Sequence, residues 1–242
     1  MESSIIVSLS RQDTLMRKMD IVANNLANMN TTAFKAERVM FTQYLVDTPS
    51  GGDLASDDIA MVRDVSTLRD DTDGGLQETG GAFDVAIAGD GYFAVDTPLG
   101  KRYTRDGHFR LDEKGQLATA HGLPVLTKDG TPIQFGPDDI NIGIGRDGTI
   151  SSAVRPLGQL AVVTFPHPER IQAVSGGLFI SDETPTDVVS PVVMQGMLEA
   201  SNVQPIVEMT RMIDVQRAFD QAGVMLDRED DRLRKMLEAY KA

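Results

Sequence analysis

Several short patterns in this 242-residue chain combine residue types that do chemistry in other proteins. Gly143, Gly145 and Gly148 have the G-x-G-x-x-G spacing of a dinucleotide-binding loop. That loop works because a helix begins directly after the glycines and offers its free N–H groups to a pyrophosphate. The residues that follow, Thr149-Ile150-Ser151-Ser152, are typical of a strand. The sequence therefore predicts a turn here and no nucleotide site.

Two other segments imitate functional loops in the same way. Asp71-Thr72-Asp73-Gly74 resembles part of a calcium loop, but Arg69 and Gly80 stand at the first and twelfth positions, where Asp and Glu are required. Val174-Ser175-Gly176-Gly177 resembles a nucleophile elbow, but Ala173 occupies the position of its first glycine. We interpret both segments as turns.

The titratable residues give no stronger indication of a reaction centre. His108, His121 and His167 are the only histidines, and none has the i, i+4 spacing that favours a metal site, so we expect no metal and no cofactor. The absence of cysteine excludes disulfides and thiolate nucleophiles. Carboxylates are numerous, and a glycosidase pair on a β scaffold stays open, although acidic residues at turns are the ordinary interpretation.

Charge and hydropathy restrict the classes of partner. The chain has 23 basic and 36 acidic residues and a net charge of −13, which argues against nucleic acids and anionic membrane surfaces as partners. No apolar run approaches the roughly 20 residues that cross a bilayer, so we expect no membrane insertion. The N-terminus also lacks the features of a cleaved secretory signal, which predicts a cytosolic protein or export by another route.

The elements that must carry any function divide the chain into three parts. From Ser4 to Asn28 there is neither Gly nor Pro, and an alternation of three and four residues samples a largely apolar series, widened by Leu9 and Met16. This series predicts an amphipathic helix with a heptad-like seam; it consists of Ile5, Ser8, Gln12, Leu15, Met19, Val22 and Leu26.

A second amphipathic helix is predicted at the other end. Pro205 suits a first helical turn, and Glu208 would lie near the positive end of the helix dipole. The same alternation downstream is apolar at all but one position, and samples Met212, Val215, Phe219, Ala222, Leu226, Glu229, Leu233 and Met236. The two seams could close on each other as an antiparallel hairpin, or each could bind another subunit; periodicity leaves both open.

Between the helices, short apolar runs alternate with turn signals. Five Asp-Gly pairs, beginning at residues 73, 90, 106, 129 and 147, favour the positive φ of hairpin turns. They predict an antiparallel all-β domain over 76–201, preceded by an extended linker segment over 34–75 that includes Pro49-Ser50-Gly51-Gly52-Asp53. The fold class expected is α+β, with a discontinuous coiled-coil-like helical domain from 1–33 and 202–242 into which the β domain is inserted.

Three ordered blocks of sequence resemble one known family. Residues 23–35, Ala-Asn-Asn-Leu-Ala-Asn-Met-Asn-Thr-Thr-Ala-Phe-Lys, are similar to the N-terminal signature of flagellar rod and hook proteins, with Ala33 where Gly is usual. Residues 75–95 and 103–109 look like the opening of that family's β domain, and residues 196–219 are similar to its C-terminal signature. Length leaves the proximal-rod and distal-rod types as candidates. Compact spacing and the Met61-Val62-Arg63-Asp64 segment before the β domain favour the proximal-rod type, with the distal-rod type as the alternative.

This resemblance implies a structural subunit and no enzyme. In the family the terminal helices form an inner coiled-coil-like layer around an axial channel, the β domain lies outside, and subunits repeat helically. The implied partners are other copies of the chain, other rod proteins and the flagellar type III export apparatus, and the implied location is the basal body, in a rod that spans the periplasm. The rod would transmit torque and pass exported proteins.

The resemblance also assigns an interface. The Asn cluster after the first helix could end that helix or satisfy polar groups at a subunit contact, and Phe34 could pack in its own domain or against a neighbour. The subunit-interface residues expected are Ile5, Leu9, Leu15, Met19, Val22, Asn24, Asn25, Leu26, Asn28, Phe34, Met212, Val215, Phe219, Ala222, Leu226 and Leu233. The alternatives of a different class are a β-rich carbohydrate-active enzyme and a monomeric binding module.

Overall fold

The computed structural model describes residues 2–46 and 59–241, with side chains over 8–40 and 67–239 apart from residues 229 and 237. It has a mixed α+β fold, as the sequence predicts, and its strands pair in antiparallel fashion. Two compact units share the chain. The helical unit comprises Met1–Ala27, Glu37–Asp70 and Gln204–Ala242, and the β unit comprises Asn28–Ala36 and Asp71–Val203.

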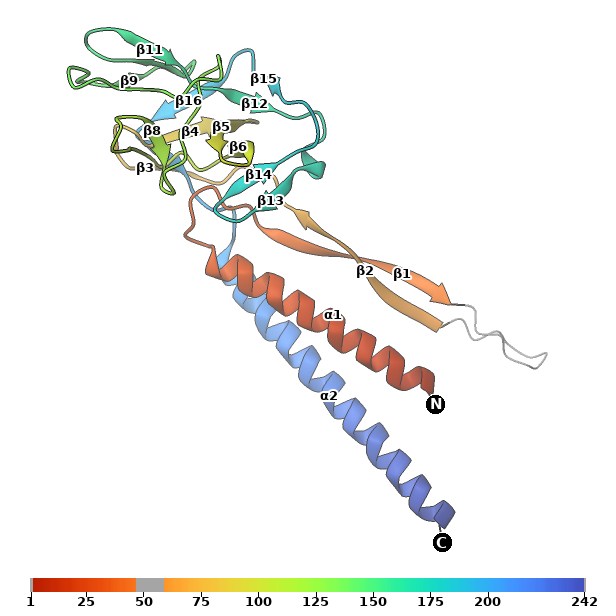
Figure 1. Cartoon of the computed structure of the whole chain (residues 1–242). Coiled ribbons are helices and arrows are strands. Elements are labelled where there is room, and N and C mark those ends of the chain that lie inside the picture. Colours follow the sequence, from red (N-terminus) through yellow and green to blue (C-terminus); the bar gives the residue numbers. More distant parts are fainter. Residues whose placement is uncertain (1, 47–58, 242) are drawn as a thin grey trace. The chain divides into compact units, whose positions relative to one another are not determined.

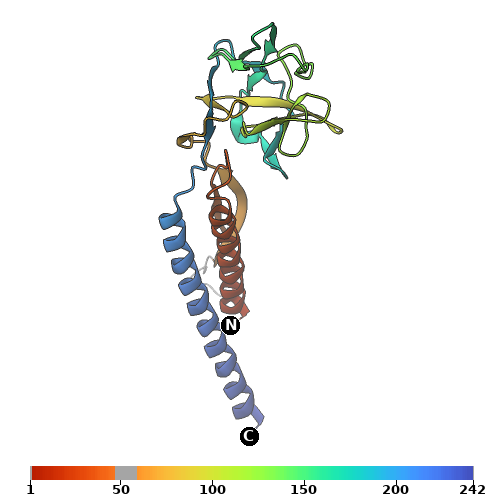
Figure 2. The ribbon, with the colours of Figure 1, turned by 90° about the vertical axis from the view of Figure 1, so that its left-hand side faces the viewer.

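The helical unit is built on two helices that are far apart in sequence. Helix α1 (Glu2–Ala27) and helix α2 (Pro205–Lys241) run antiparallel and side by side (Figures 1 and 2). They pack through the predicted faces, where Leu15, Val22 and Ala222 are buried. Within the described residues, no helix is long and apolar enough to cross a membrane.

A hairpin accompanies the helices in this unit. Strands β1 (Glu37–Val46) and β2 (Ile59–Arg69) pair in antiparallel register from Glu37 opposite Arg69 to Val46 opposite Ile59. They cover half of the segment expected as an extended linker over 34–75. Runs such as Val39–Tyr44 form strands because they are rich in the β-branched and aromatic residues that favour this conformation. The Pro- and Gly-containing stretch at 49–53 lies outside the described residues.

The β unit consists of short strands grouped around two cores. Its largest sheet has the order β13-β14-β6-β5-β12-β15, and smaller groups pair β16 with β4, β17 with β3, β7 with β8, and β10 with both β9 and β11. The strand bounds are β3 Leu76–Glu78, β4 Val85–Ala88, β5 Tyr92–Thr97, β6 Gly100–Thr104, β7 Phe109–Leu111, β8 Leu117–Thr119, β9 Gly143–Ile144, β10 Thr149–Ser151, β11 Pro156–Gln159, β12 Val162–Thr164, β13 Gln172–Val174, β14 Leu178–Ile180, β15 Thr186–Asp187, β16 Val192–Gln195 and β17 Met197–Glu199, and a 3-10 turn spans Pro168–Arg170.

The two cores are built from different residues of neighbouring strands. One is largely aliphatic and centres on Phe93, Leu117 and Ile150. The other is richer in aromatic rings, and in it Tyr103 meets Phe165 edge to face with ring centroids 4.9 Å apart. Burial of so much apolar surface within residues 71–203 gives the β unit its own source of stability.

The Asp-Gly pairs lie in turns and connections, and their glycines are needed for two different reasons. Gly130 and Gly148 have φ near +80°, as hairpin turns require. The expectation of positive φ is wrong for Gly74 and Gly107, which are not in that conformation. A Cβ at Gly107 would lie 1.6 Å from the Val85 carbonyl oxygen, and one at Gly74 would lie 1.8 Å from the Ala200 carbonyl oxygen. These two glycines allow close approach of backbones.

Candidate subunit interface

The structure places most of the expected interface residues between the two helices of one chain. Leu15, Val22 and Ala222 are buried, while Leu9 is half exposed. The half-buried members are Met19, Leu26, Met212, Val215, Phe219, Leu226 and Leu233, and Asn24 is exposed. The side chain of Ile5 lies outside the described residues. The predicted seams therefore meet within the chain, and whether they also bind a neighbour remains a prediction.

Asn25 joins α1 to the start of the hairpin. Its side chain is 1% exposed; its Oδ1 accepts from the Glu37 backbone N–H at 2.9 Å and its Nδ2 donates to the Glu37 carbonyl at 2.9 Å. Nδ2 also lies 3.4 Å from Oε2 of the buried Glu208, which pairs with Arg211 on α2. One amide thus satisfies both polar backbone groups of a strand residue and also contacts α2.

The turn after α1 adopts the conformation that Ala33 disfavours. Ala33 is buried and has a φ of +56°. This left-handed backbone conformation costs residues other than Gly roughly 1–2 kcal/mol. Its N–H donates to the Glu199 carbonyl at 2.8 Å, and the Asn28 side chain accepts from the Thr31 hydroxyl at 3.1 Å. The surrounding hydrogen bonds hold the residue in place despite the strain, and the half-buried Phe34 follows it within the β unit.

A buried ion cluster in the β unit joins the three blocks of sequence that carry the family resemblance. Glu199, 2% exposed, accepts from Lys35 at 2.6 Å and from Arg105 Nε at 2.7 Å. Arg105 also binds Asp73 at 2.7 Å, and Lys35 donates to the Thr72 carbonyl at 2.7 Å. Burial raises the pKa of Glu199, but the hydrogen bond from Lys35 and the charge of Arg105 lower it below its ordinary value.

The ion cluster is continued by backbone and amide hydrogen bonds. Asn202 Oδ1 accepts from the Ala36 N–H at 2.7 Å, its own N–H donates to the Phe34 carbonyl at 3.2 Å, and its Nδ2 donates to the Thr72 carbonyl at 3.0 Å. Three segments of the β unit are therefore held together by these contacts: residues 34–36, residues 72–73 and residues 199–202.

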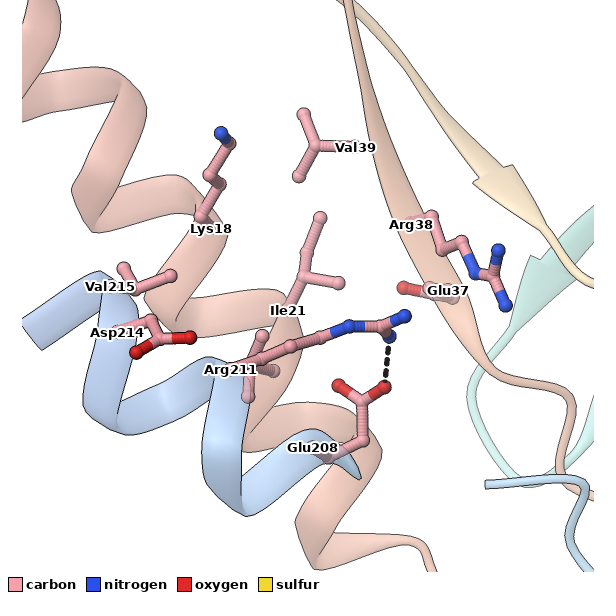
Figure 3. A pocket seen from close by; sticks show the side chains of 10 residues that line it. Lys18, Ile21, Glu37, Arg38, Val39, Glu208, Arg211, Asp214 and Val215 are labelled. Carbon is pink, nitrogen blue, oxygen red and sulfur yellow. Dashed lines mark hydrogen bonds and ion pairs between the residues drawn. The ribbon is translucent and has the colours of Figure 1, made fainter. Parts of the chain in front are cut away.

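A groove opens in the helical unit between α1, α2 and β1 (Figure 3). Its volume is about 310 Å³, and Ile21, Val22, Val39 and Val215 give it an apolar lining. Charged side chains of both signs line the rest: Lys18, Glu37, Arg38, Glu208, Arg211 and Asp214. An apolar groove with a charged rim is typical of a site that takes apolar side chains of a partner.

Sequence reasoning missed a second apolar surface of α2. Ile206, Met209, Ile213 and Val224 are 81%, 47%, 50% and 49% exposed. At 3.6 residues per turn these four positions fall within about 60° of one another, on the side of α2 away from the α1 seam. We call them the outer stripe. A search for a second apolar periodicity, offset from the first, would have found it.

The groups that could suggest catalysis have structural partners. His108 Nδ1 lies 2.7 Å from Asp84 Oδ1, and the Thr79 hydroxyl donates to the other oxygen of Asp84 at 2.6 Å. A nucleophile would need its hydroxyl on the imidazole, so this arrangement differs from a catalytic triad. Asp147 accepts from the Thr149 N–H at 3.0 Å in the turn of the G-x-G-x-x-G segment, where strand β10 and no helix follows.

Comparison with known protein families covers both helices and the β unit. Residues 5–35 match a flagella basal body rod protein family, residues 86–152 match the flagellar hook protein FlgE/F/G D1 domain, and residues 194–239 match the flagellar basal body rod FlgEFG protein C-terminal family. The blocks at 23–35 and 196–219 lie inside the first and last of these regions, and the block at 75–109 overlaps the middle one.

Individual relatives align with nearly the whole chain. The flagellar basal-body rod protein FlgF of Caulobacter vibrioides is 38% identical over 98% of both chains, and FlgF of Mesorhizobium japonicum is 37% identical over 93% of this chain and 92% of its own. FlgG of Buchnera aphidicola subsp. Schizaphis graminum is 33% identical over 96% of this chain and 98% of its own. The chain therefore belongs to the family of flagellar basal-body rod proteins and is of the FlgF type.

Proposed function

We propose that this chain polymerises through its helical unit into the proximal part of the rod, where it transmits torque and lines a channel for exported proteins. As a member of the rod family it is a structural subunit that assembles with other rod components. The observation that carries the proposal is the apolar surface left exposed on both helices of the helical unit, including Leu9 and Met16 on α1 and the outer stripe on α2. Exposed apolar surface of this kind marks an interaction site.

The architecture supports different roles for the two units: the β unit folds around its own cores, and the helical unit offers surface to neighbours. The β unit has two cores of its own, so its fold does not depend on a partner. The described part of α2 has only Ala222 and Glu208 fully buried, so most of this helix has surface to offer to neighbours. We propose that the two helices form a discontinuous coiled-coil-like domain in the assembled rod, and that the chain reaches the periplasm through the flagellar type III apparatus.

The distal rod is the second candidate position. FlgG relatives are 28–34% identical over 93–97% of this chain, and the upper end of that range reaches the 34–38% identity of the FlgF relatives. The two positions differ in the neighbours that the subunit contacts, so they can be told apart by mapping those neighbours in intact basal bodies.

Deletion and complementation test the function. Removal of the gene is expected to abolish swimming, and the restored, tagged chain should copurify with basal bodies and label the membrane-proximal part of the rod in electron micrographs. Label at the distal part would favour the FlgG-like position. Normal swimming without the chain, or its absence from basal bodies, would refute a role in the rod.

A further inference from the structure

The groove and the outer stripe lie on different sides of the same helix. Glu208, Arg211 and Val215 turn one side of α2 toward the groove, as Figure 3 shows for their side chains. Ile206 and Ile213, by the helical repeat, project from the other side and are 81% and 50% exposed. Helix α2 thus lines the groove with one side and carries the outer stripe on the other.

The spacing of the stripe suits a groove. Ile206, Met209 and Ile213 stand at positions i, i+3 and i+7, the pattern by which an amphipathic helix inserts apolar anchors into a hydrophobic groove. The groove, at about 310 Å³, has room for apolar side chains from such a helix, and its apolar lining residues Ile21, Val39 and Val215 would contact them.

We propose that the groove of one copy binds the outer stripe of α2 from a second copy of this chain. The inference rests on the proposed function, because it assigns the self-contact of the polymerising subunit to named surfaces. The groove and the outer stripe are different surfaces, so the contact is heterologous. Each bound copy therefore still presents a free groove or a free stripe, which is the condition for growth into a helical polymer.

Charge favours a second copy as the occupant. The whole chain carries −13, so two copies repel each other except where charges are balanced locally. The groove is balanced: its three basic residues Lys18, Arg38 and Arg211 offset its three acidic ones. The charge of the stripe is balanced too, because one basic and one acidic residue, Arg217 and Asp220, lie on the same side of α2 between Ile213 and Val224. Contact through these surfaces therefore brings together the regions of the chain with little net charge.

Cysteine cross-linking in intact basal bodies tests the contact. The natural chain has no cysteine, so introduced thiols are unique. In a strain whose only copy carries Val39→Cys and Ile213→Cys, a short bismaleimide is expected to yield dimers and higher multiples of this chain on a denaturing gel. Each single variant should yield no such multiples. Val39→Cys with Met225→Cys is the matched control, because Met225 is exposed on α2 but lies outside the stripe, and it should give no multiples.

The outcomes separate this inference from the proposed function. Rods that assemble and support swimming but give no multiples with the paired thiols would overturn the groove-and-stripe contact and leave the rod role intact. A Val39→Cys product that contains a different protein would overturn the second copy as occupant. Absence of the chain from basal bodies would instead count against the proposed function.

A second pair of variants keeps the test independent of thiol geometry. Ile213→Asp places a charge in the apolar contact and is expected to lower the amount of chain in isolated basal bodies by roughly tenfold or more, since an unpaired charge in an apolar site is costly. Met225→Asp should leave that amount unchanged. Equal amounts for Ile213→Asp and the wild type would overturn the proposal.

Discussion

At the scale of single residues, Glu199 lies at the centre of the buried ion cluster, which joins segments of the β unit that are far apart in sequence. It is buried between Lys35 and Arg105, one from the N-terminal block of sequence and one from the β domain. Removal of one member of a buried ion pair leaves the remaining charges without compensation. The cluster therefore imposes one arrangement on three segments that are distant in sequence.

Replacement of Glu199 by Gln should destabilise the β unit by about 3 kcal/mol, because Lys35 and Arg105 would keep their charges in a buried site. Urea denaturation followed by circular dichroism measures the change. Glu169→Gln, at an exposed position, is the matched control and should have little effect. Equal stability of the Glu199→Gln variant and the wild type would contradict the role given to the cluster.

The same carboxylate predicts a pH dependence. The pKa of Glu199 is lower in the folded protein than its ordinary value of 4.5, so the folded state favours the ionised form. Its contribution to stability is therefore fully present above that ordinary value and is lost as the pH falls through the lower, folded pKa. Over this acid range, the urea midpoint of the wild type should fall more steeply than that of the Glu199→Gln variant. Parallel curves would show that Glu199 does not control this loss.

Ala33 provides a prediction of the opposite sign. Its φ of +56° costs more for Ala than for Gly, so Ala33→Gly should stabilise the protein by up to about 1 kcal/mol despite the greater freedom of Gly in the unfolded chain. The neighbouring Ala36, also buried but not in a positive-φ conformation, is the control, and Ala36→Gly should destabilise. A loss of stability in both variants would mean that strain at Ala33 is negligible.

At the scale of elements, the seam between α1 and α2 is the feature on which we expect assembly to depend. Phe219 and Leu226 are half-buried on the face of α2 that packs on α1. Phe219→Asp or Leu226→Asp is expected to abolish rod assembly, because a charge in the seam separates the helices, while the β unit keeps its fold. Swimming and the thermal unfolding of the purified chain measure the two effects.

Met225→Asp is the control for the seam variants, since Met225 belongs to the same helix and is 59% exposed. It should support swimming. If Phe219→Asp also built functional rods, the assignment of the seam would be wrong. If Phe219→Asp unfolded the β unit as well, the two units would not be independent.

At the scale of the whole molecule, the two units should differ in their resistance to protease. Helix α2 has 37 residues and α1 has 26, so 11 residues of α2 have no counterpart on α1, and long stretches of α2 are exposed. Limited proteolysis of the dilute monomer, followed by mass spectrometry, should remove the helices first and leave a core within about residues 71–203. Uniform resistance from end to end would show that the helices bury their seams fully within one chain.

Much of the fold follows from local sequence. The 3-4 alternation, with few helix-breaking residues, determines that residues 2–27 and 205–241 are helices, because that spacing places apolar side chains on one face. Asp-Gly pairs between short apolar runs determine an antiparallel β region. The three blocks of sequence also identified the family, which the full-length relatives confirm.

Only the tertiary structure decided which distant residues meet. Lys35, Arg105 and Glu199 are each ordinary in the sequence, and their cluster arises from chain connections that periodicity does not encode. Gly107 is required by the approach of the Val85 backbone, and strands β1 and β2 are stabilised by pairing with each other. Sequence periodicity reports which face of an element is apolar; the partner of that face depends on long-range packing, so the groove beside β1 became visible only in three dimensions.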